Sequence, residues 1–394
     1  MLGFGSVRRV ADGGHGVLGR REWMVGMVAA GLMPAAARSA EPLSAVVGRH
    51  FEPLLAAHAV PGMSIAVLHR GDAHLFSYGT TSAAGGDKVT DSTLFELGSI
   101  SKIFTATLGG LAEALGRIAP GDHPGQHLPD LRGTPIDAAT LLQLGTYTAG
   151  GLPLQFPDGL QGEAAILRFF SAWRPEALPG TQRRYSNPSI GLFGHVAARA
   201  MGGAYAELAE RELFPALGLR DTYIHVPRAA MPRYAWGHGR NGDPIRVAAG
   251  PLDAEAYGVK STAADMLRFL QAQLHPDGLP SALRHAIAIT HEPRYRSGAL
   301  VQALGWERYS WPAPLERLLE GNSPAMALQP HRVETPVPQN GRGTLLNKTG
   351  STNGFGAYVA LLPEHGTGLA MLANRNLPNA ERVRAAHAVL SALA

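Results

Sequence analysis

The chain has 394 residues, of which 45% are hydrophobic and 17% charged, which allows a large core and argues against disorder. The first 40 residues carry +3 of the formal +4 charge. About +1 remains elsewhere, with no basic run, so nucleic acid is not an expected partner. The absence of cysteine excludes disulfides, thiolate metal sites and a cysteine nucleophile.

Residues 1–40 have the pattern of an export signal. A basic region ends in Arg20-Arg21, residues 23–37 are uncharged, and small residues follow. The uncharged stretch is shorter than the roughly 20 residues that a membrane-spanning helix needs. The arginine pair resembles a twin-arginine signal, but an ordinary secretory leader or a start at Met24 would also fit. We expect a periplasmic protein, exported by the Sec or twin-arginine route, with no membrane contact after signal removal.

Apolar spacing then predicts the first folded elements. Residues 43–59 have helical spacing and end before a Pro-Gly pair. Residues 63–68 and 73–78 read as two strands of a hairpin. After a polar loop, Ser99 is expected to open a long apolar helix that runs to about Leu115.

The middle of the chain changes to short helical runs separated by Pro and Gly, whereas strands return towards the end. We expect helices over 137–144, 163–173, 189–201, 205–213 and 379–393, and strands over 356–362 and 368–374. This order predicts an α/β part built from residues 41–120 and 240–394, and an all-α insertion over 121–239. Together they would form one catalytic unit, with the site in the crevice between them.

The four lysines are the most informative residues of the chain, because arginine supplies the other 31 basic side chains. Lys102 follows Ser99 at the Ser-x-x-Lys spacing, which places both side chains on one face of a helix start. A serine needs a nearby base, and an amine serves as one only if its pKa is lowered, for example by a second cation such as Lys348. Alone, this spacing more often marks a helix cap with a solvated lysine.

Two further motifs complete a signature. Tyr185-Ser186-Asn187 offers a hydroxyl and an amide, and Lys348-Thr349-Gly350-Ser351 offers a cation, a close backbone approach and a backbone N–H. We expect the second motif to precede an edge strand. Each is a common tripeptide or tetrapeptide alone, but all three in this order favour a serine enzyme that attacks an amide or ester carbonyl.

Metal and nucleotide sites have little support. The 16 histidines show no ligand spacing, and His238 and His291 are interpreted as surface or structural residues. The single Gly-x-Gly-x-x-Gly match, residues 237–242, is followed by Asp243-Pro244 where a helix would be needed, so it is expected to be a loop. No cofactor and no metal are expected.

These residues allow a family to be named. From about residue 43 to 392 the chain resembles class C serine β-lactamases, members of the penicillin-recognising serine enzyme superfamily. The resemblance is carried by the segments 95–102, 146–155, 252–261, 348–358 and 371–382. It implies a β-lactamase/transpeptidase-like α/β (α+β) fold, an antiparallel sheet flanked by helices plus the all-α part, and a monomer.

The resemblance also implies catalytic roles. Ser99 would be the nucleophile that opens the lactam and forms an acyl-enzyme, while Lys102 and Tyr185 would share proton transfer, with Lys348 beside them. The backbone N–H groups of Ser99 and Ser351 would form the oxyanion hole. Substrate would be bound by a further set of residues: Gln155 and Asn187 at its amide side chain, Tyr257 in the side-chain pocket, and Lys348, Thr349, Asn379 and Arg382 at its carboxylate.

Two positions depart from the family pattern, and one motif is missing. Asn347 stands where many relatives have His, which would alter pH dependence, and Glu381 stands beside Arg382 where a small residue is common. The Glu-x-x-Leu-Asn segment with which class A enzymes deacylate does not occur. The base for deacylation therefore stays open between Tyr185, Lys102 and the substrate amine.

Other functions remain as alternatives. An esterase or a D-stereospecific peptidase could use the same three residues, although Tyr147-Thr148-Ala149-Gly150 resembles β-lactamases more closely. A sensor that acylates without turnover is the second alternative, but no DNA-binding or transmembrane signalling segment is visible. We expect hydrolysis of β-lactam antibiotics, and the family resemblance favours cephalosporins.

Overall fold

The computed structural model describes residues 41–335 and 343–394. Residues Pro42–Ala394 form one compact unit. The expected export signal lies outside the described residues. Within the described part of the chain, no helix is both long enough and apolar enough to cross a membrane.

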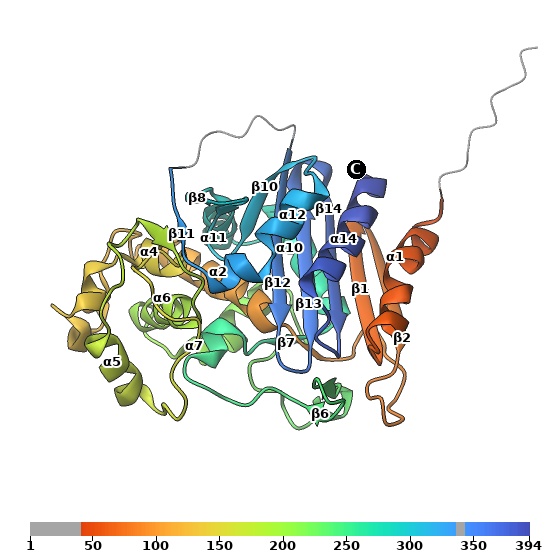
Figure 1. Cartoon of the computed structure of the whole chain (residues 1–394), viewed down its shortest axis with the longest axis horizontal. Helices are drawn as coiled ribbons and strands as arrows, with labels where there is room; N and C mark the ends of the chain where they lie inside the picture. The colour runs from red at the N-terminus through yellow and green to blue at the C-terminus, as the bar shows by residue number, and fades with distance from the viewer. Residues whose placement is uncertain (1–40, 336–342) are drawn as a thin grey trace, which may run out of the picture. The chain divides into compact units, whose positions relative to one another are not determined.

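The centre of this unit is an antiparallel sheet of eight strands built from both ends of the chain (Figure 1). Its strands, in spatial order, are β2 (Asp72–Gly79), β1 (Gly62–His69), β14 (Thr367–Ala373), β13 (Gly356–Leu362), β12 (Gly343–Ser351), β10 (Glu307–Trp311), β9 (Leu300–Gln302) and β8 (Tyr295–Ser297). β13 and β14 are buried throughout, because both faces of the sheet are covered. The predicted hairpin and the two predicted C-terminal strands are confirmed.

One expectation about the sheet is wrong. The motif Lys348–Ser351 does not precede an edge strand but forms the last four residues of β12, which lies between β13 and β10 inside the sheet. The sequence did not predict β12 as a strand because its final residues are polar. They are polar since they face cavities at the end of the sheet, where a site can lie.

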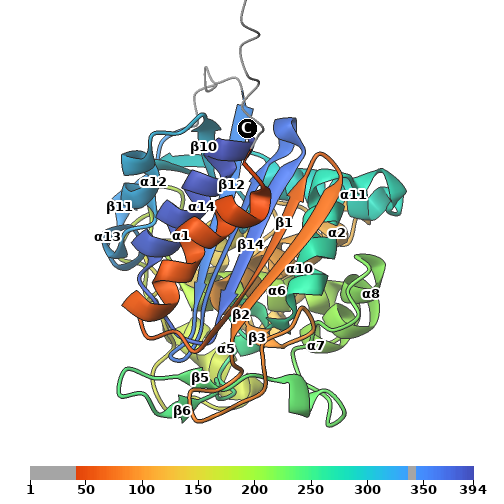
Figure 2. The same cartoon turned by 90° about the vertical axis from the view of Figure 1, so that its right-hand side faces the viewer.

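One face of the sheet is covered by the two terminal helices, α1 (Leu43–Ala57) and α14 (Asn379–Leu393) (Figure 2). Their apolar side chains pack with alternate residues of the strands, such as Ile65 and its register partner Met371. α14 has the predicted bounds, and α1 ends two residues earlier than predicted. α12 (Leu315–Gly321) packs beside α14 on the same face.

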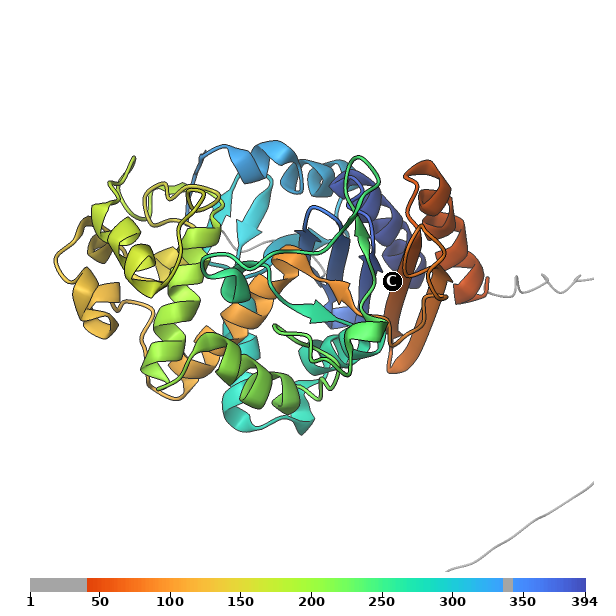
Figure 3. The ribbon, with the colours of Figure 1, turned by 90° about the horizontal axis from the view of Figure 1, so that it is seen from below.

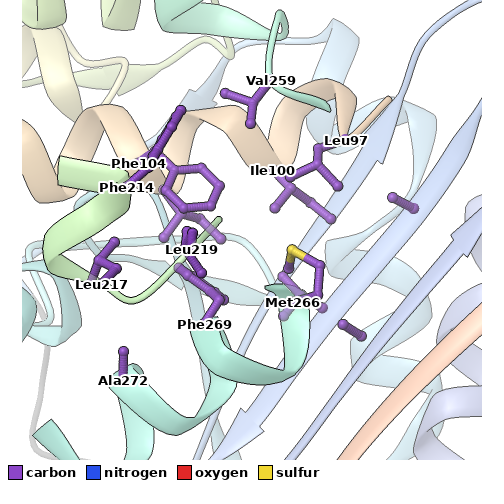
Figure 4. Packing of buried hydrophobic residues seen from close by; sticks show 14 of the residues in the cluster. Leu97, Ile100, Phe104, Phe214, Leu217, Leu219, Val259, Met266, Phe269 and Ala272 are labelled. Atoms are coloured by element: carbon purple, nitrogen blue, oxygen red, sulfur yellow. The ribbon is translucent and has the colours of Figure 1, made fainter. Parts of the chain in front are cut away.

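The other face is covered by α2 (Ser101–Ala114), α10 (Ala263–Leu274) and α11 (Ser281–His291). Phe104 of α2 is the centre of an aromatic cluster, with ring centroids 5.3 Å from Phe214 and 5.1 Å from Phe269 (Figure 4). Nearly every residue of α2 is buried. A helix that is apolar all round lies in the interior, and α2 is the central helix of this unit.

Between α2 and α8 the regular secondary structure consists mainly of short helices, and this segment lies to one side of the sheet (Figure 3). Its helices are α3 (Pro124–His127), α4 (Leu141–Gly145), α5 (Glu163–Ala172), α6 (Asn187–Ala200), α7 (Tyr205–Leu208) and α8 (Phe214–Ala216). They enclose a core of their own. Two expected helices are interrupted: 137–144 is split into a 3-10 turn (Pro135–Ala138) and α4, and α7 passes into a π-helical turn at Ala209–Leu213.

Short elements complete the unit. They are β3 (Phe95–Glu96) with β7 (Lys260–Ser261), β4 (Gln182–Arg183) with β11 (His331–Arg332), β5 (Gly237–His238) with β6 (Pro244–Ile245), and the helices α9 (Asp253–Ala256) and α13 (Pro324–Leu328). β4 and β5 fall inside the part expected to be all-α. In the glycine-rich segment 237–242, which was expected to be a loop, Gly237 and His238 form β5 and the following residues make the turn to β6. The part boundaries at residues 120 and 240 remain a prediction.

Candidate active site

Ser99 and Lys102 meet at the beginning of the central helix. Ser99 lies in a 3-10 turn (Gly98–Ile100) directly before α2, so the helix begins two residues later than predicted. Lys102 Nζ lies 3.0 Å from Ser99 Oγ and donates a second hydrogen bond to the Ala256 carbonyl at 2.6 Å. The Lys102 side chain is fully buried. The alternative of a helix cap with a solvated lysine is therefore excluded.

Two glycines let the chain around Ser99 lie directly on the end of β12. Gly98 has a φ of +52°, and a Cβ added to it would come within 2.4 Å of Ser351 N. A Cβ on Gly350 would lie 2.0 Å from the Leu97 carbonyl oxygen. With no side chain between the two segments, Ser99 and Ser351 line the same two cavities.

Tyr185 completes the centre of the site. Two ammonium groups lie close to its ring centroid, Lys102 Nζ at 5.1 Å and Lys348 Nζ at 4.9 Å. Its ring also packs against Tyr147, with centroids 4.9 Å apart. The buried Tyr185 hydroxyl faces Ser99 and the ammonium groups of Lys102 and Lys348. A phenol in this position is available to a group that enters the cavity.

The surroundings shift the pKa values of Lys102 and Tyr185 towards neutrality. Burial, together with the neighbouring charge of Lys348, lowers the pKa of Lys102 to about 8 against the opposing effects of Tyr185 and Glu307. Burial would raise the pKa of Tyr185, but the charges of Lys102 and Lys348 outweigh it and lower that pKa to about 8. Because the two pKa values lie close together, a proton can pass between Lys102 and Tyr185 at little cost in free energy.

A buried ion network that the sequence did not predict surrounds Glu307. Glu307 lies 3.4 Å from Lys348 Nζ and 3.6 Å from Arg183 NH2. Burial opposes the charge on Lys348, but Glu307 and Tyr185 raise its pKa above the ordinary value, so it stays a cation. Arg183 also donates to Gln302 Oε1 at 2.7 Å. No signal pointed to Arg183 or Glu307, because Arg183 is one of many arginines and Glu307 lies in an unpredicted strand.

The larger cavity, about 1150 Å³, is lined by Gln155, Asn187 and Tyr257 beside Ser99. Asn187 Nδ2 donates to Gln155 Oε1 at 2.8 Å, which joins α6 to the loop before α5. The buried Asn187 Oδ1 has no partner among the described residues, so it can accept a hydrogen bond from a bound molecule. Tyr257 Oη lies against Gly250 on the opposite wall.

The smaller cavity, about 210 Å³, shares Ser99, Tyr185 and Ser351 with the larger one. Lys348, Thr349 and Asn379 line it, together with Arg183 and Glu307. Asn379 Nδ2 donates to the Asn322 carbonyl at 3.3 Å. Two cations face one carboxylate there, so this end of the site favours an anionic group.

Arg382 is placed differently from the other expected site residues. It is 1% exposed and is not among the residues that line either cavity. All three guanidinium nitrogens donate to protein oxygen atoms. The acceptors include the Gly350 carbonyl at 2.6 Å, the Ala357 carbonyl at 3.1 Å and Ser351 Oγ at 3.1 Å. The side chain thus lies behind the end of β12.

The described residues hold no cluster of His, Asp or Glu suited to a metal ion. His238 is buried and pairs with the Ala83 backbone N–H at 3.1 Å, while His291 pairs with Gln273 Oε1 at 2.9 Å. Both are structural, as expected. The chemistry that the cleft offers is nucleophilic attack by a serine beside an amine and a phenol of lowered pKa.

Comparison with known proteins gives the family. A sequence model of the β-lactamase family matches residues 47–394. The β-lactamase of Pseudomonas fluorescens is 48% identical over 350 residues, covering 88% of this chain and 98% of the relative. That of Escherichia coli (strain K12) is 42% identical over 356 residues, covering 90% and 94%. The crystal structure of a β-lactamase/D-alanine carboxypeptidase from Pseudomonas syringae matches with a TM-score of 0.85 and 41% identity, covering 89% of this chain and 98% of that one.

The antiparallel sheet, with a serine and a buried lysine at the end of it, is the architecture of the penicillin-recognising serine hydrolases. Within that class, the chain belongs to the β-lactamase family. The predicted family and fold class are confirmed.

Proposed function

We propose that this protein hydrolyses β-lactam antibiotics through an acyl-enzyme on Ser99. The observation that carries the proposal is the 3.0 Å contact between Ser99 Oγ and a fully buried amine whose pKa is lowered to about 8. It occurs in a member of the β-lactamase family, where the two cavities meet. Class C relationship and a preference for cephalosporins follow from the family resemblance.

In acylation, Ser99 Oγ attacks the lactam carbonyl carbon and its proton passes to the Lys102–Tyr185 pair. The developing oxyanion would accept hydrogen bonds from the Ser99 and Ser351 N–H groups. Cleavage of the carbon–nitrogen bond delivers a proton to the lactam nitrogen. In deacylation, water attacks the ester and gives its proton to the same pair or to the freed substrate amine, and Ser99 Oγ takes up a proton as the ester bond breaks.

Substrate binding would use both cavities. Asn187 Oδ1 is the free acceptor for an amide N–H, with Gln155 holding the Asn187 side chain and Tyr257 forming the opposite wall. The carboxylate of the substrate would lie in the smaller cavity against Lys348, Thr349 and Asn379. We propose that Arg382 supports β12 from behind, because its guanidinium N–H groups already donate hydrogen bonds to protein oxygen atoms.

A second candidate is cleavage of D-alanine peptides, because the Pseudomonas syringae protein of similar structure is also named a D-alanine carboxypeptidase. The same nucleophile and base would serve, with a peptide carbonyl in place of the lactam.

We propose a monomer exported to the periplasm by residues 1–40, which act as a signal that is removed.

The test is hydrolysis by residues 41–394, followed by lactam absorbance with a cephalosporin and a penicillin, and by D-alanine release from a D-alanyl-D-alanine peptide. Ser99→Ala should lower turnover by a factor on the order of a million, because it removes the nucleophile. Mass spectrometry of wild type during turnover should show a covalent adduct that Ser99→Ala lacks. Turnover retained by Ser99→Ala would remove Ser99 from its role, and a stable adduct without turnover would indicate a sensor.

A further inference from the structure

Glu96 is a buried carboxylate that the mechanism above does not use. It is the second residue of β3, three residues before Ser99, and only 1% of it is exposed. Its two oxygens accept hydrogen bonds from three segments that are distant in sequence: Tyr234, Val247 and Thr352. Two of these three donor residues, Val247 and Thr352, also line the larger cavity.

We propose that Glu96 is a positioning residue that holds two walls of the cleft in place relative to Ser99. One wall is the end of β12, with the Ser351 N–H, and the other is the segment 245–252. The inference rests on the proposed function, since it concerns how the oxyanion hole and the acyl side-chain cavity are built.

The first connection fixes the turn after Ser351. Thr352 Oγ1 donates to Glu96 Oε2 at 2.5 Å and accepts from Phe355 N at 3.2 Å. Thr352 N donates to the Phe355 carbonyl at 3.1 Å, which closes the turn between β12 and β13. The Ser351 N–H is therefore held by a turn that Glu96 anchors to the strand before Ser99. Electrostatic stabilisation of an oxyanion depends on donors held at a fixed distance.

The second connection fixes the opposite wall. Glu96 Oε1 accepts from Val247 N at 2.7 Å and from Tyr234 Oη at 2.6 Å. Arg246, the neighbour of Val247, lies over the rings of Tyr234 and Trp236, 4.0 and 4.1 Å from their centroids. Residues 245–252 form this wall of the larger cavity. Loss of the carboxylate would free the wall and leave a backbone N–H without its acceptor.

A buried charge costs free energy, so its retention needs a reason. A carboxyl group can receive three donors from three directions because it has two acceptor oxygens, whereas the amide of a glutamine has one. Lys260 is the register partner of Glu96 across β3 and β7. Burial lowers the pKa of Lys260, and Glu96 opposes this lowering. The hydrogen bonds of Glu96 are made to the walls of the cleft.

The test compares Thr352→Val with Thr352→Ser, a matched pair in which only the second keeps the hydroxyl, and adds Glu96→Gln and Tyr234→Phe. The probes are a boronic acid that bonds to the nucleophilic serine, and a cephalosporin under single-turnover conditions. Melting temperatures identify variants that fail to fold.

Thr352→Val and Glu96→Gln should each lower the acylation rate and the boronic acid affinity about tenfold or more, with KM much less affected. Thr352→Ser should stay near wild type. Tyr234→Phe should raise KM for a substrate with a large acyl side chain more than for one with a small side chain. The proposal is overturned if Thr352→Val and Glu96→Gln keep wild-type boronic acid affinity, or if Thr352→Ser loses as much as Thr352→Val. Absence of β-lactam turnover by wild type would count against the proposed function alone, because boronic acid binding still tests Glu96.

Discussion

Arg382 shows how burial changes the interpretation of a single residue. The family resemblance implies that it recognises the substrate carboxylate, which requires an open guanidinium. Its nitrogens instead donate to the carbonyls of Gly350 and Ala357, to Ser351 Oγ and to Asn376 Oδ1. Asn376 lines the larger cavity, so any influence on substrate would pass through it or through the strand.

We predict that Arg382→Lys lowers the acylation rate about tenfold while changing KM little. Lysine has three donors on one nitrogen and cannot reproduce the fork that holds Gly350 and Ser351 together. Single-turnover and steady-state kinetics with one cephalosporin would measure both quantities, with Arg384→Lys on the exposed side of α14 as control. A rise in KM with an unchanged acylation rate would instead assign Arg382 direct recognition of the carboxylate.

At the scale of elements, the short helix α9 connects the site to the helical core. Its Ala256 carbonyl accepts from Lys102, and the Glu255 carbonyl accepts from Thr105 Oγ1 of α2 at 2.6 Å. The Glu255 side chain is buried between α2 and α6, so close to Gly194 that a Cβ there would lie 3.0 Å from Glu255 Cγ. Burial raises the pKa of Glu255 to about 8.

This raised pKa predicts a pH-dependent stability. Between the ordinary value of 4.5 and about 8 the folded state keeps the Glu255 proton that the unfolded state has lost, so stability falls as pH rises through this window. Glu255→Gln removes the titration and should stabilise the protein at pH 8 by on the order of 4 kcal/mol relative to wild type. The gain should be much smaller at pH 5.

Denaturant unfolding of both proteins at the two pH values measures the effect, with the exposed Glu316→Gln as control. An equal difference at pH 5 and pH 8 would mean that Glu255 is ionised in the folded protein.

At the scale of the whole molecule, the three apolar clusters share elements. β1 contributes Ala66 and Leu68 to the cluster under α2 and α10, and Ile65 and Val67 to the cluster under α1 and α14. Within α2, Phe104 belongs to the first cluster and Ala106 to the core of the helical part. The sheet part and the helical part therefore cannot lose their cores independently of each other.

We therefore predict that residues 42–394 unfold in one cooperative transition. Far-UV circular dichroism and tryptophan fluorescence should give the same midpoint, and the calorimetric and van't Hoff enthalpies should agree. Phe104→Ala should lower both midpoints together, at a cost of roughly 3–5 kcal/mol. Separate midpoints for the two probes would show that the helical part unfolds independently.

Local sequence determined a large part of this protein. The helix at 379–393 follows from helical spacing of its apolar residues, and the strands around 63–68 and 356–362 follow from short apolar runs that are buried on both faces. The spacing of Ser99 and Lys102 depends on a single helical turn, which brings them within 3.0 Å. The sequence alone thus predicted the family, the fold class and a serine next to a lysine.

Only the tertiary structure decided how the distant parts meet. The contacts of Tyr185 with two ammonium groups, the Glu307 and Arg183 network, and the three hydrogen bonds of Glu96 join residues separated by up to 256 positions. Such contacts produce no local pattern in the sequence, because the two partners are far apart along the chain and meet only when it folds. The lowered pKa values of Lys102 and Tyr185 are decided at the same level, because burial and neighbouring charge exist only in the folded protein.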